Sequence, residues 1–254
     1  MKRHFRTLLP ILAAALCALP AWAQPGAAPG GGGMNTALLK LLGKNTTFTA
    51  KGSMRMLDGT QKEMATMPFQ MAMLEDKTRI EMDMSEMKGQ LMPPQVLAQM
   101  KSAGVEKNIF ISRPDKKVNY IVNAGANGYV EVPFAKEELA SLDTRTKVEK
   151  SSLGKETIDG HACTKNKAIV TDGDGKAHEF TTWNATDLKD FPIQLQTTEN
   201  GFVVIMQYKN VQFTKTDARQ FEPPIGLTKF ANAEAMNAVV MQRLMNAAAP
   251  PGTK

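Results

Sequence analysis

Residues 47 to 84 alternate apolar and polar side chains with the period of a β-strand. The region contains TFTAKGSMRM at 47–56, MPFQMAM at 67–73 and RIEMDM at 79–84. Every second residue in each stretch is apolar, which predicts three half-buried strands that share one apolar face. Turn signals lie between them at Asp58-Gly59 and at Glu75-Asp76-Lys77. This spacing is typical of an antiparallel meander.

Methionine dominates the apolar face of this meander. The chain has 17 methionines, and eleven of them lie between Met54 and Met100. Methionine is unbranched and polarizable, so it suits surfaces that must adapt to ligands of varied shape. We therefore predict a hydrophobic groove for an acyl chain or a similar ligand, and the alternative is an ordinary core covered by helices. The predicted groove residues are Phe48, Met54, Met56, Phe69, Met71, Met73, Ile80, Met82 and Met84, with Tyr120 and Trp183 as aromatic residues suited to its mouth.

The same region supports a second hypothesis, a soft-metal site. Met82, Met84 and Met87 form an M-x-M-x-x-M run. Thioether ligands select Cu(I), and two sulfurs on one strand face could converge on one ion. Soft-metal sites usually also recruit a His or Cys, and His161 and His178 are distant in sequence.

The rest of the chain predicts more strands and a few short helices. Helical patterns cover residues 36–43, 93–104, 135–142 and 232–246, with glycine or proline punctuation at several ends. Strand patterns cover residues 108–112, 118–123, 128–132, 146–152, 157–170, 177–184, 193–198 and 202–213. The fold class is therefore antiparallel α+β. We expect one domain at 35–246, after a Gly/Pro-rich linker at 24–34 and before a tail at 247–254.

The N-terminus has the pattern of a secretory signal. A basic start is followed by an apolar run from Leu8 to Leu19 and by Ala21-Trp22-Ala23, so we expect cleavage after residue 23. Leu16 precedes Cys17 where a lipoprotein signal needs a small residue. No later stretch approaches the length of a membrane helix. These features predict a periplasmic protein without a transmembrane segment.

Charge and cysteine content exclude several classes. The predicted signal carries three basic residues and no acid, so its removal lowers the formal charge from +6 to +3, too little to indicate nucleic-acid binding. Cys163 remains as the single cysteine, which precludes an internal disulfide.

Catalytic motifs are absent from the sequence. His161 and Cys163 are two residues apart, with Asp159 in line, which permits a nucleophile pair but is more typical of a buried thiol beside a turn histidine. The Asp172-Gly-Asp-Gly175 stretch lacks the ligands of a calcium loop and predicts a hairpin turn. No serine elbow, zinc motif or phosphate-binding loop occurs. The sequence predicts a non-enzymatic protein without a cofactor.

Three segments resemble a known family. They are LGKETIDGHACTK at 153–165, WNATDLKDFPI at 183–193 and FEPPIG at 221–226. They are similar to an uncharacterised domain family of exported bacterial proteins, whose fold resembles the periplasmic lipoprotein carriers and their outer-membrane acceptors (LolA/LolB-like). The resemblance covers most of residues 45–230. It implies a strongly curved, incomplete antiparallel barrel closed by short helices, with an apolar concavity. A lipid or a lipidated protein would then be the partner.

A third hypothesis is an envelope protein–protein adaptor that displays strand edges or the helix at 232–246. Met236, Val239, Val240 and Leu244 repeat there with helical spacing. An exposed apolar stripe on this helix would favour an adaptor, whereas a stripe packed under the sheet would not.

Overall fold

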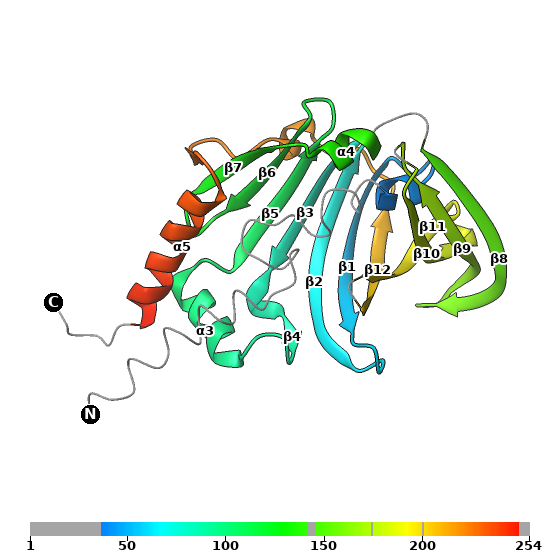
Figure 1. Cartoon of the computed structure of the whole chain (residues 1–254), viewed down its shortest axis with the longest axis horizontal. Coiled ribbons are helices and arrows are strands. Elements are labelled where there is room, and N and C mark those ends of the chain that lie inside the picture. The colour runs from blue at the N-terminus through cyan, green and yellow to red at the C-terminus, as the bar shows by residue number, and fades with distance from the viewer. Residues whose placement is uncertain (1–36, 142–145, 174, 200, 249–254) are drawn as a thin grey trace.

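The computed structural model describes residues 37–141, 146–173, 175–199 and 201–248. Within these ranges the strands form one sheet (Figure 1). The strands are β1 (Thr47–Leu57), β2 (Glu63–Leu74), β3 (Lys77–Asp83), β4 (Lys88–Gly89), β5 (Lys107–Arg113), β6 (Val118–Asn123), β7 (Gly128–Pro133), β8 (Lys147–Ile158), β9 (His161–Thr171), β10 (Ala177–Ala185), β11 (Phe191–Glu199), β12 (Phe202–Gln212) and β13 (Thr228–Phe230).

The helices are short and few in the described ranges. They are α3 (Pro94–Ala103), α4 (Lys136–Ser141) and α5 (Ala233–Ala248), together with the 3₁₀ turns η2 (Met84–Glu86), η3 (Thr186–Leu188) and η4 (Ala218–Phe221). A further helical turn spans residues 37–41 and ends before Gly43, whose φ of +60° is the left-handed conformation expected after a helix. No helix in these ranges is both long and apolar enough to cross a bilayer.

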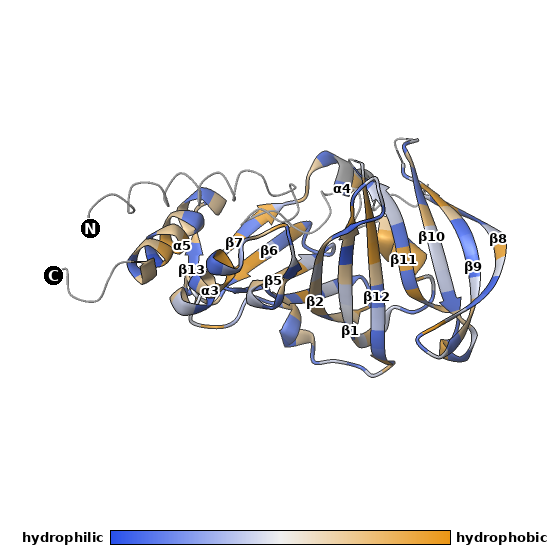
Figure 2. Cartoon of the chain, turned by 90° about the horizontal axis from the view of Figure 1, so that it is seen from below, coloured by the Kyte–Doolittle hydropathy of each residue, from blue (hydrophilic) through white to orange (hydrophobic). Residues whose placement is uncertain are grey.

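The strand order is β13-β7-β6-β5-β3-β2-β1-β12-β11-β10-β9-β8, with β4 paired to β2. Among the described residues the paired strands run antiparallel, except that β13 pairs in parallel with β7. The sheet is large, curved and open, with β13 and β8 at its two ends (Figure 2). This confirms the predicted curved antiparallel architecture, although strands outweigh helices more than an α+β class suggests. The register of β1 on β2, and of β2 on β3, also confirms the predicted meander.

β-Bulges occur at several places along the sheet. The register shifts between Thr49 and Lys51 on β1, between Ser152 and Gly154 on β8, and between Trp183 and Asn184 on β10. An extra residue on one strand bends that strand and increases its twist. The bulges therefore contribute to the curl of the sheet, which Figure 2 shows from below.

Two details of the predicted strands are wrong. The predicted strand at 157–170 is broken, because Asp159 and Gly160 have φ of +50° and +85° and form a tight turn between β8 and β9. The predicted strand that includes Met84 ends at Asp83, whose Oδ1 accepts a hydrogen bond from the backbone N–H of Ser85 at 2.9 Å and caps η2.

The two faces of the sheet differ in composition. One face, called the inner face here, carries Phe48, Met71 and Met82 and belongs to a large hydrophobic cluster. The opposite, outer face carries polar residues and two small apolar clusters. Figure 2 shows hydrophilic and hydrophobic residues alternating along the strands, as this arrangement requires.

The signal at residues 1–23 and the linker at 24–34 lie outside the described residues. The helix predicted at 232–246 is α5, which continues to Ala248, so the start of the predicted tail is helical. Met236, Val240 and Leu244 are buried in the inner cluster. The apolar stripe that an adaptor would have to expose is therefore packed against the rest of the protein.

Candidate functional site

The structure brings most of the predicted groove residues together on the inner face. Phe48, Met54, Phe69, Met71, Met73, Met82 and Met84 are buried members of one cluster, and Ile80 packs against it. Cross-strand register explains the contact, since Met71 on β2 lies opposite Ala50 on β1 and Ile80 on β3. Met56 is buried, at 1% exposure, but does not belong to this cluster.

Methionines from outside the meander complete the same cluster. Met87 follows η2, Met100 comes from α3, Met206 from β12 and Met236 from α5. Together with the meander residues they make eleven buried methionines in one cluster, a set called the methionine cluster below: Met54, Met67, Met71, Met73, Met82, Met84, Met87, Met92, Met100, Met206 and Met236. Thioethers therefore approach the inner face from the sheet and from the helices that lie beside it.

The helical side of the cluster is formed by α3 and α5, which pack against each other. The Gln99 side-chain amide donates a hydrogen bond to the backbone oxygen of Leu244 at 3.2 Å and joins the two helices. Val96 and Met100 of α3 meet Val240 and Leu244 of α5 in the apolar cluster. Figure 1 shows the pair beside the β7 end of the sheet.

Aromatic rings gather in the middle of the inner face, on β2, β1, β12 and β11. Phe191 on β11 and Tyr208 on β12 lie 5.4 Å apart by ring centroids, and each also contacts Phe48, at 4.9 Å and 6.5 Å. Phe69 meets Tyr208 at 5.7 Å. All four contacts are edge-to-face, a favourable arrangement for aromatic pairs. Burial raises the pKa of the Tyr208 phenol far above its ordinary value.

Sequence reasoning missed Phe191 and Tyr208. Tyr208 lies on the predicted strand at 202–213, but Phe191 lies two residues before the predicted strand at 193–198, because β11 begins earlier than the sequence pattern indicated. However, their contact with Phe48 depends on the pairing of β1 with β12, which joins residues more than a hundred positions apart. No local pattern reveals such a pairing.

Tyr120 and Trp183 do not join the methionine cluster. Tyr120 belongs to a separate cluster with Phe221 of η4, and its ring meets Tyr129 at 6.0 Å. Trp183 belongs to a third cluster with Cys163. The structure therefore places the two predicted mouth residues away from the groove residues.

Trp183 is held by charged neighbours instead. Its Nε1–H donates a hydrogen bond to the Glu156 carboxylate at 2.6 Å. The same carboxylate accepts from Lys165 at 2.7 Å, and the Lys165 ammonium lies 5.1 Å from the indole centroid. These interactions lock the orientation of the ring. They connect β8, β9 and β10, so their role is structural in this arrangement.

Met82, Met84 and Met87, the residues of the soft-metal hypothesis, are all buried in the methionine cluster. They come from consecutive elements, because Met82 lies one residue before the end of β3, Met84 begins η2 and Met87 follows η2. The predicted sharing of one strand face by Met82 and Met84 is therefore wrong, although burial in one cluster keeps all three side chains in the same region. Among the described residues no group of three or more His, Cys, Asp or Glu side chains is arranged to hold a metal ion.

His161, Cys163 and Asp159 do not form a nucleophile site. Cys163 is 2% exposed, and its thiol donates to the backbone oxygen of His161 at 3.4 Å. Burial raises the pKa of this thiol, which disfavours the reactive thiolate. His161 Nδ1 pairs with the Asp187 carboxylate at 2.7 Å, and Asp159 lies in the turn, where it accepts from Lys209.

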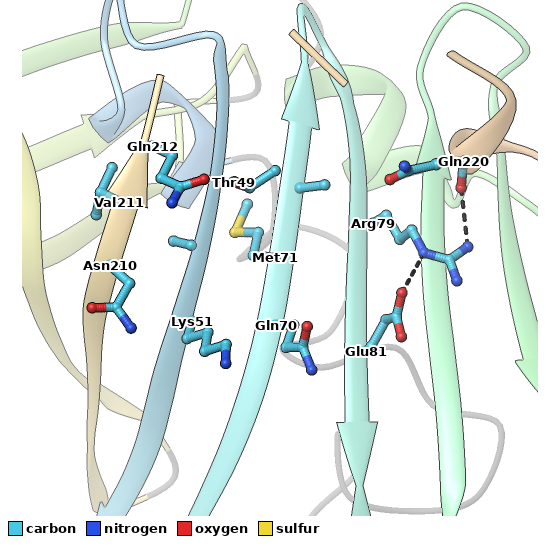
Figure 3. A pocket seen from close by; sticks show the side chains of 12 residues that line it. Thr49, Lys51, Gln70, Met71, Arg79, Glu81, Asn210, Val211, Gln212 and Gln220 are labelled. Carbon is cyan, nitrogen blue, oxygen red and sulfur yellow. Dashed lines mark hydrogen bonds and ion pairs between the residues drawn. The ribbon is translucent and has the colours of Figure 1, made fainter. Parts of the chain in front are cut away.

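The outer face carries a polar pocket of about 550 Å³. It lies over β12, β1, β2 and β3, beside the segment that contains η4 (Figure 3). The lining residues are Thr49, Ala50, Lys51, Gln70, Met71, Ala72, Arg79, Glu81, Asn210, Val211, Gln212 and Gln220. The sequence analysis did not anticipate this pocket, because it forms where distant segments meet.

The fold and the inner face together define a class, a large, open and curved antiparallel sheet with a buried apolar cluster on its inner face. The family is identified by sequence. A model described as a domain of unknown function (DUF4412) matches residues 48–191, and the chain belongs to that family. This confirms the family predicted from the segments at 153–165 and 183–193, while the segment at 221–226 lies beyond the match. No curated protein matches the chain significantly.

Several solved structures are similar to the chain. A LolA superfamily protein from Nitrosomonas europaea has 7% identity and a TM-score of 0.38, and the match covers 75% of this chain and 97% of that one. The lipoprotein LppX from Mycobacterium tuberculosis has 11% identity and a TM-score of 0.39, with 78% and 95% covered. LprF from Mycobacterium bovis has 12% identity and a TM-score of 0.36, with 72% and 92% covered.

Proposed function

We propose that this protein is a non-enzymatic periplasmic protein that binds a hydrophobic or amphipathic ligand on the inner face of its sheet. The ligand class is an acyl chain, carried by a lipid or by a lipidated protein. The observation that supports this proposal is the methionine cluster, in which eleven thioether side chains line one region from both the sheet and the helices. An ordinary strand core would use stiff β-branched residues at many of these positions.

The flexibility of the methionine cluster is the physical reason for proposing an acyl chain as its ligand. Met71, Met73 and Met82 are each 5% exposed or less, so a guest must displace side chains to reach them. Methionine has three rotatable side-chain bonds and no branch, and it repacks at lower cost than Ile or Val. A wall of such residues can close on itself when empty and open around a chain.

The energy of binding would come from apolar area. Burial of apolar surface contributes about 25 cal/mol per Å² before the costs of association. A single acyl chain enclosed by the wall would reach a Kd on the order of a micromolar. Tyr120 and Trp183 lie in other clusters and have no part in this groove.

A titration of the mature chain, starting at Gln24, with a fluorescent fatty acid tests the proposal. The test variant combines Met71→Leu, Met73→Leu and Met82→Leu, which keeps the apolar volume but makes the wall stiffer. The matched control combines Met64→Leu and Met245→Leu, because Met64 is on the opposite face of β2 and Met245 is 39% exposed.

We expect saturable binding by the parent protein, about tenfold weaker binding by the triple variant, and unchanged binding by the control. Urea unfolding of all three proteins separates a change in affinity from a loss of fold. No uptake by the parent protein contradicts the proposal. If the triple variant binds the fatty acid as tightly as the parent protein, the thioethers are not the cause of the affinity.

Soft-metal binding is the second candidate, favoured by the burial of Met82, Met84 and Met87 in one cluster. Thioethers are suitable ligands for Cu(I). A competition titration with a Cu(I) chelator tests it, with all three residues changed to leucine in the variant. The hypothesis fails when parent and variant compete equally for the ion. A lower affinity for Cu(I) in the variant than in the parent protein supports the hypothesis.

A further inference from the structure

The polar pocket on the outer face is separate from the proposed lipid site. Adjacent residues of a strand point to opposite faces, so Lys51 and Gln70 point away from the methionine cluster, whereas Ala50 and Met71 point toward it. A ligand of the outer pocket therefore lies across the sheet from the inner groove, and Ala50 and Met71 line the pocket although their side chains belong to the inner cluster. Figure 3 shows Lys51, Gln70 and Asn210 side by side on neighbouring strands.

The η4 segment, which lies beside the pocket and contributes Gln220 to its lining, is anchored to the sheet. Arg79 on β3 donates from Nη1 to the backbone oxygen of Gln220 at 3.0 Å and from Nε to Glu81 at 2.7 Å. Phe221, the next residue, is fully buried in the outer cluster. Arg113 holds the same segment through the Phe221 oxygen and the Glu222 carboxylate. The pocket is therefore preorganised, which reduces the entropic cost of binding.

A β-bulge shapes the floor of the pocket. The register between β1 and β12 shifts between Thr49 and Lys51, and Asn210 on β12 has a φ of +52°. This left-handed conformation is uncommon for residues other than glycine, although Asn tolerates it better than most. Bulges often redirect a side chain beside a functional site. Here the bulge adds Asn210 to the polar lining.

The lining offers hydrogen-bonding groups that are available to a ligand. Within the described residues, the side-chain amides of Gln70, Asn210, Gln212 and Gln220 make no hydrogen bond, and neither does the Lys51 ammonium. A carboxamide both donates and accepts, as a hydroxyl group does. Several carboxamides around one pocket therefore match a ligand with several hydroxyl groups.

The charges of the pocket indicate one further group on the ligand. Arg79 and Glu81 neutralise each other as an ion pair at 2.7 Å, which leaves Lys51 as the uncompensated cation of the lining within the described residues. One anionic group on the ligand would meet this ammonium. The volume, about 550 Å³, is within the usual range of small-molecule sites.

We propose that the outer pocket binds an acidic sugar, a polyhydroxylated ring that carries one carboxylate. The carboxamides pair with the hydroxyl groups, and Lys51 pairs with the carboxylate. The ligand is a free sugar acid or one unit of an acidic glycan. Because the hydrogen bonds form in a partly open pocket, we expect a Kd on the order of a millimolar.

An NMR titration of the ¹⁵N-labelled mature protein with glucuronate tests the proposal, with glucose as the uncharged counterpart. The side-chain amide signals of Gln70, Asn210, Gln212 and Gln220 report on the pocket itself. We expect saturable shifts of these signals with glucuronate and about tenfold weaker binding of glucose. A short glucuronate oligomer that binds more tightly than the monomer identifies a glycan, whereas equal affinity identifies the free sugar acid.

The variant Lys51→Met removes the ammonium and keeps an apolar stem, and Lys150→Met on the exposed strand β8 is the matched control. Binding of glucuronate should weaken about tenfold in the first variant and remain unchanged in the second. The proposal is overturned when the four amide signals do not move, when glucose binds as well as glucuronate, or when Lys51→Met has no effect. These probes do not report on the inner groove, so failure here leaves the proposed lipid binding intact.

Discussion

The substitution Gly52→Ala adds only one methyl group, but it should destabilise the protein strongly. Gly52 on β1 lies opposite Phe69 on β2 and Tyr208 on β12. A Cβ at this position would overlap the Phe69 ring and lie 2.6 Å from the backbone oxygen of Gln207. The ring is buried at 3% exposure, and the carbonyl belongs to the sheet, so neither neighbour can move freely.

The magnitude follows from two costs. Overpacking of a well-packed core costs about 1–3 kcal/mol. Displacement of Phe69 also weakens its edge-to-face contact with Tyr208, and such contacts contribute about 0.5–1.5 kcal/mol. We therefore expect a loss of about 3 kcal/mol in the free energy of unfolding, which lowers Tm by roughly 6–12 °C for a chain of this size.

Urea unfolding of the chain from Gln24 onward measures this loss. The control is Gly59→Ala in the turn after β1, where a Cβ would meet nothing within 4 Å, and its effect should stay within about 0.5 kcal/mol. The same Gly52→Ala change should cost less in a Phe69→Leu background, since one of its two clashes is removed. A Gly52→Ala protein as stable as the Gly59→Ala control would show that the strands do not approach as described.

Three further predictions concern residues outside the methionine cluster. The Arg113 guanidinium donates to the Asp115 carboxylate and lowers its pKa to about 2, so Asp115 stabilises the fold above about pH 4 and loses this effect as the pH falls through 2. In urea unfolding, Asp115→Asn should cost roughly 1 kcal/mol at neutral pH, after allowance for solvent exposure, and only a small part of that at pH 2. Trp183→Phe removes the hydrogen bond to Glu156 and should lower stability by about 1 kcal/mol, and an unchanged unfolding midpoint would contradict that role. Cys163 should react with a thiol reagent only after unfolding, because its thiol is buried and has a raised pKa; rapid labelling of the native protein would show an accessible thiolate.

The sequence predicted the sheet through alternation, which is a local property. The meander from Thr47 to Asp83 was readable because each strand carries its own apolar face and a turn signal separates it from the next. The turn at Asp159-Gly160 has an equally strong signal but lies within a long strand pattern, and that pattern masked it. Met84 was misplaced because the capping by Asp83 ends the strand one residue earlier than the alternation does.

The site was predictable only in part, for a related reason. Within one strand, alternation divides the side chains between two faces. It does not show which face of a second strand, distant in sequence, lies on the same side of the sheet. A bulge adds one residue to a strand and reverses the assignment beyond it, as Ile193 on β11 illustrates, since Trp183 pairs with Gln194 and Asn184 with Pro192. Tyr120 and Trp183 were predicted at the groove mouth from their aromatic character alone, which does not assign a face, and they lie in other clusters. The polar pocket depends on the pairing of β1 with β12 and on the η4 segment, so no single stretch of sequence contains it.

Direct localisation of an acyl chain on the inner face is the sharpest test of the proposed function. The mature protein, labelled with ¹³C at the methionine methyl groups, would be titrated with a fatty acid that carries a nitroxide near its chain end. We expect strong broadening of the Met71, Met73 and Met82 signals, with little change for Met64 on the other face and for the exposed Met245. Uniform broadening of all five signals, or none at all, would show that the methionine cluster is a closed core and not a binding site.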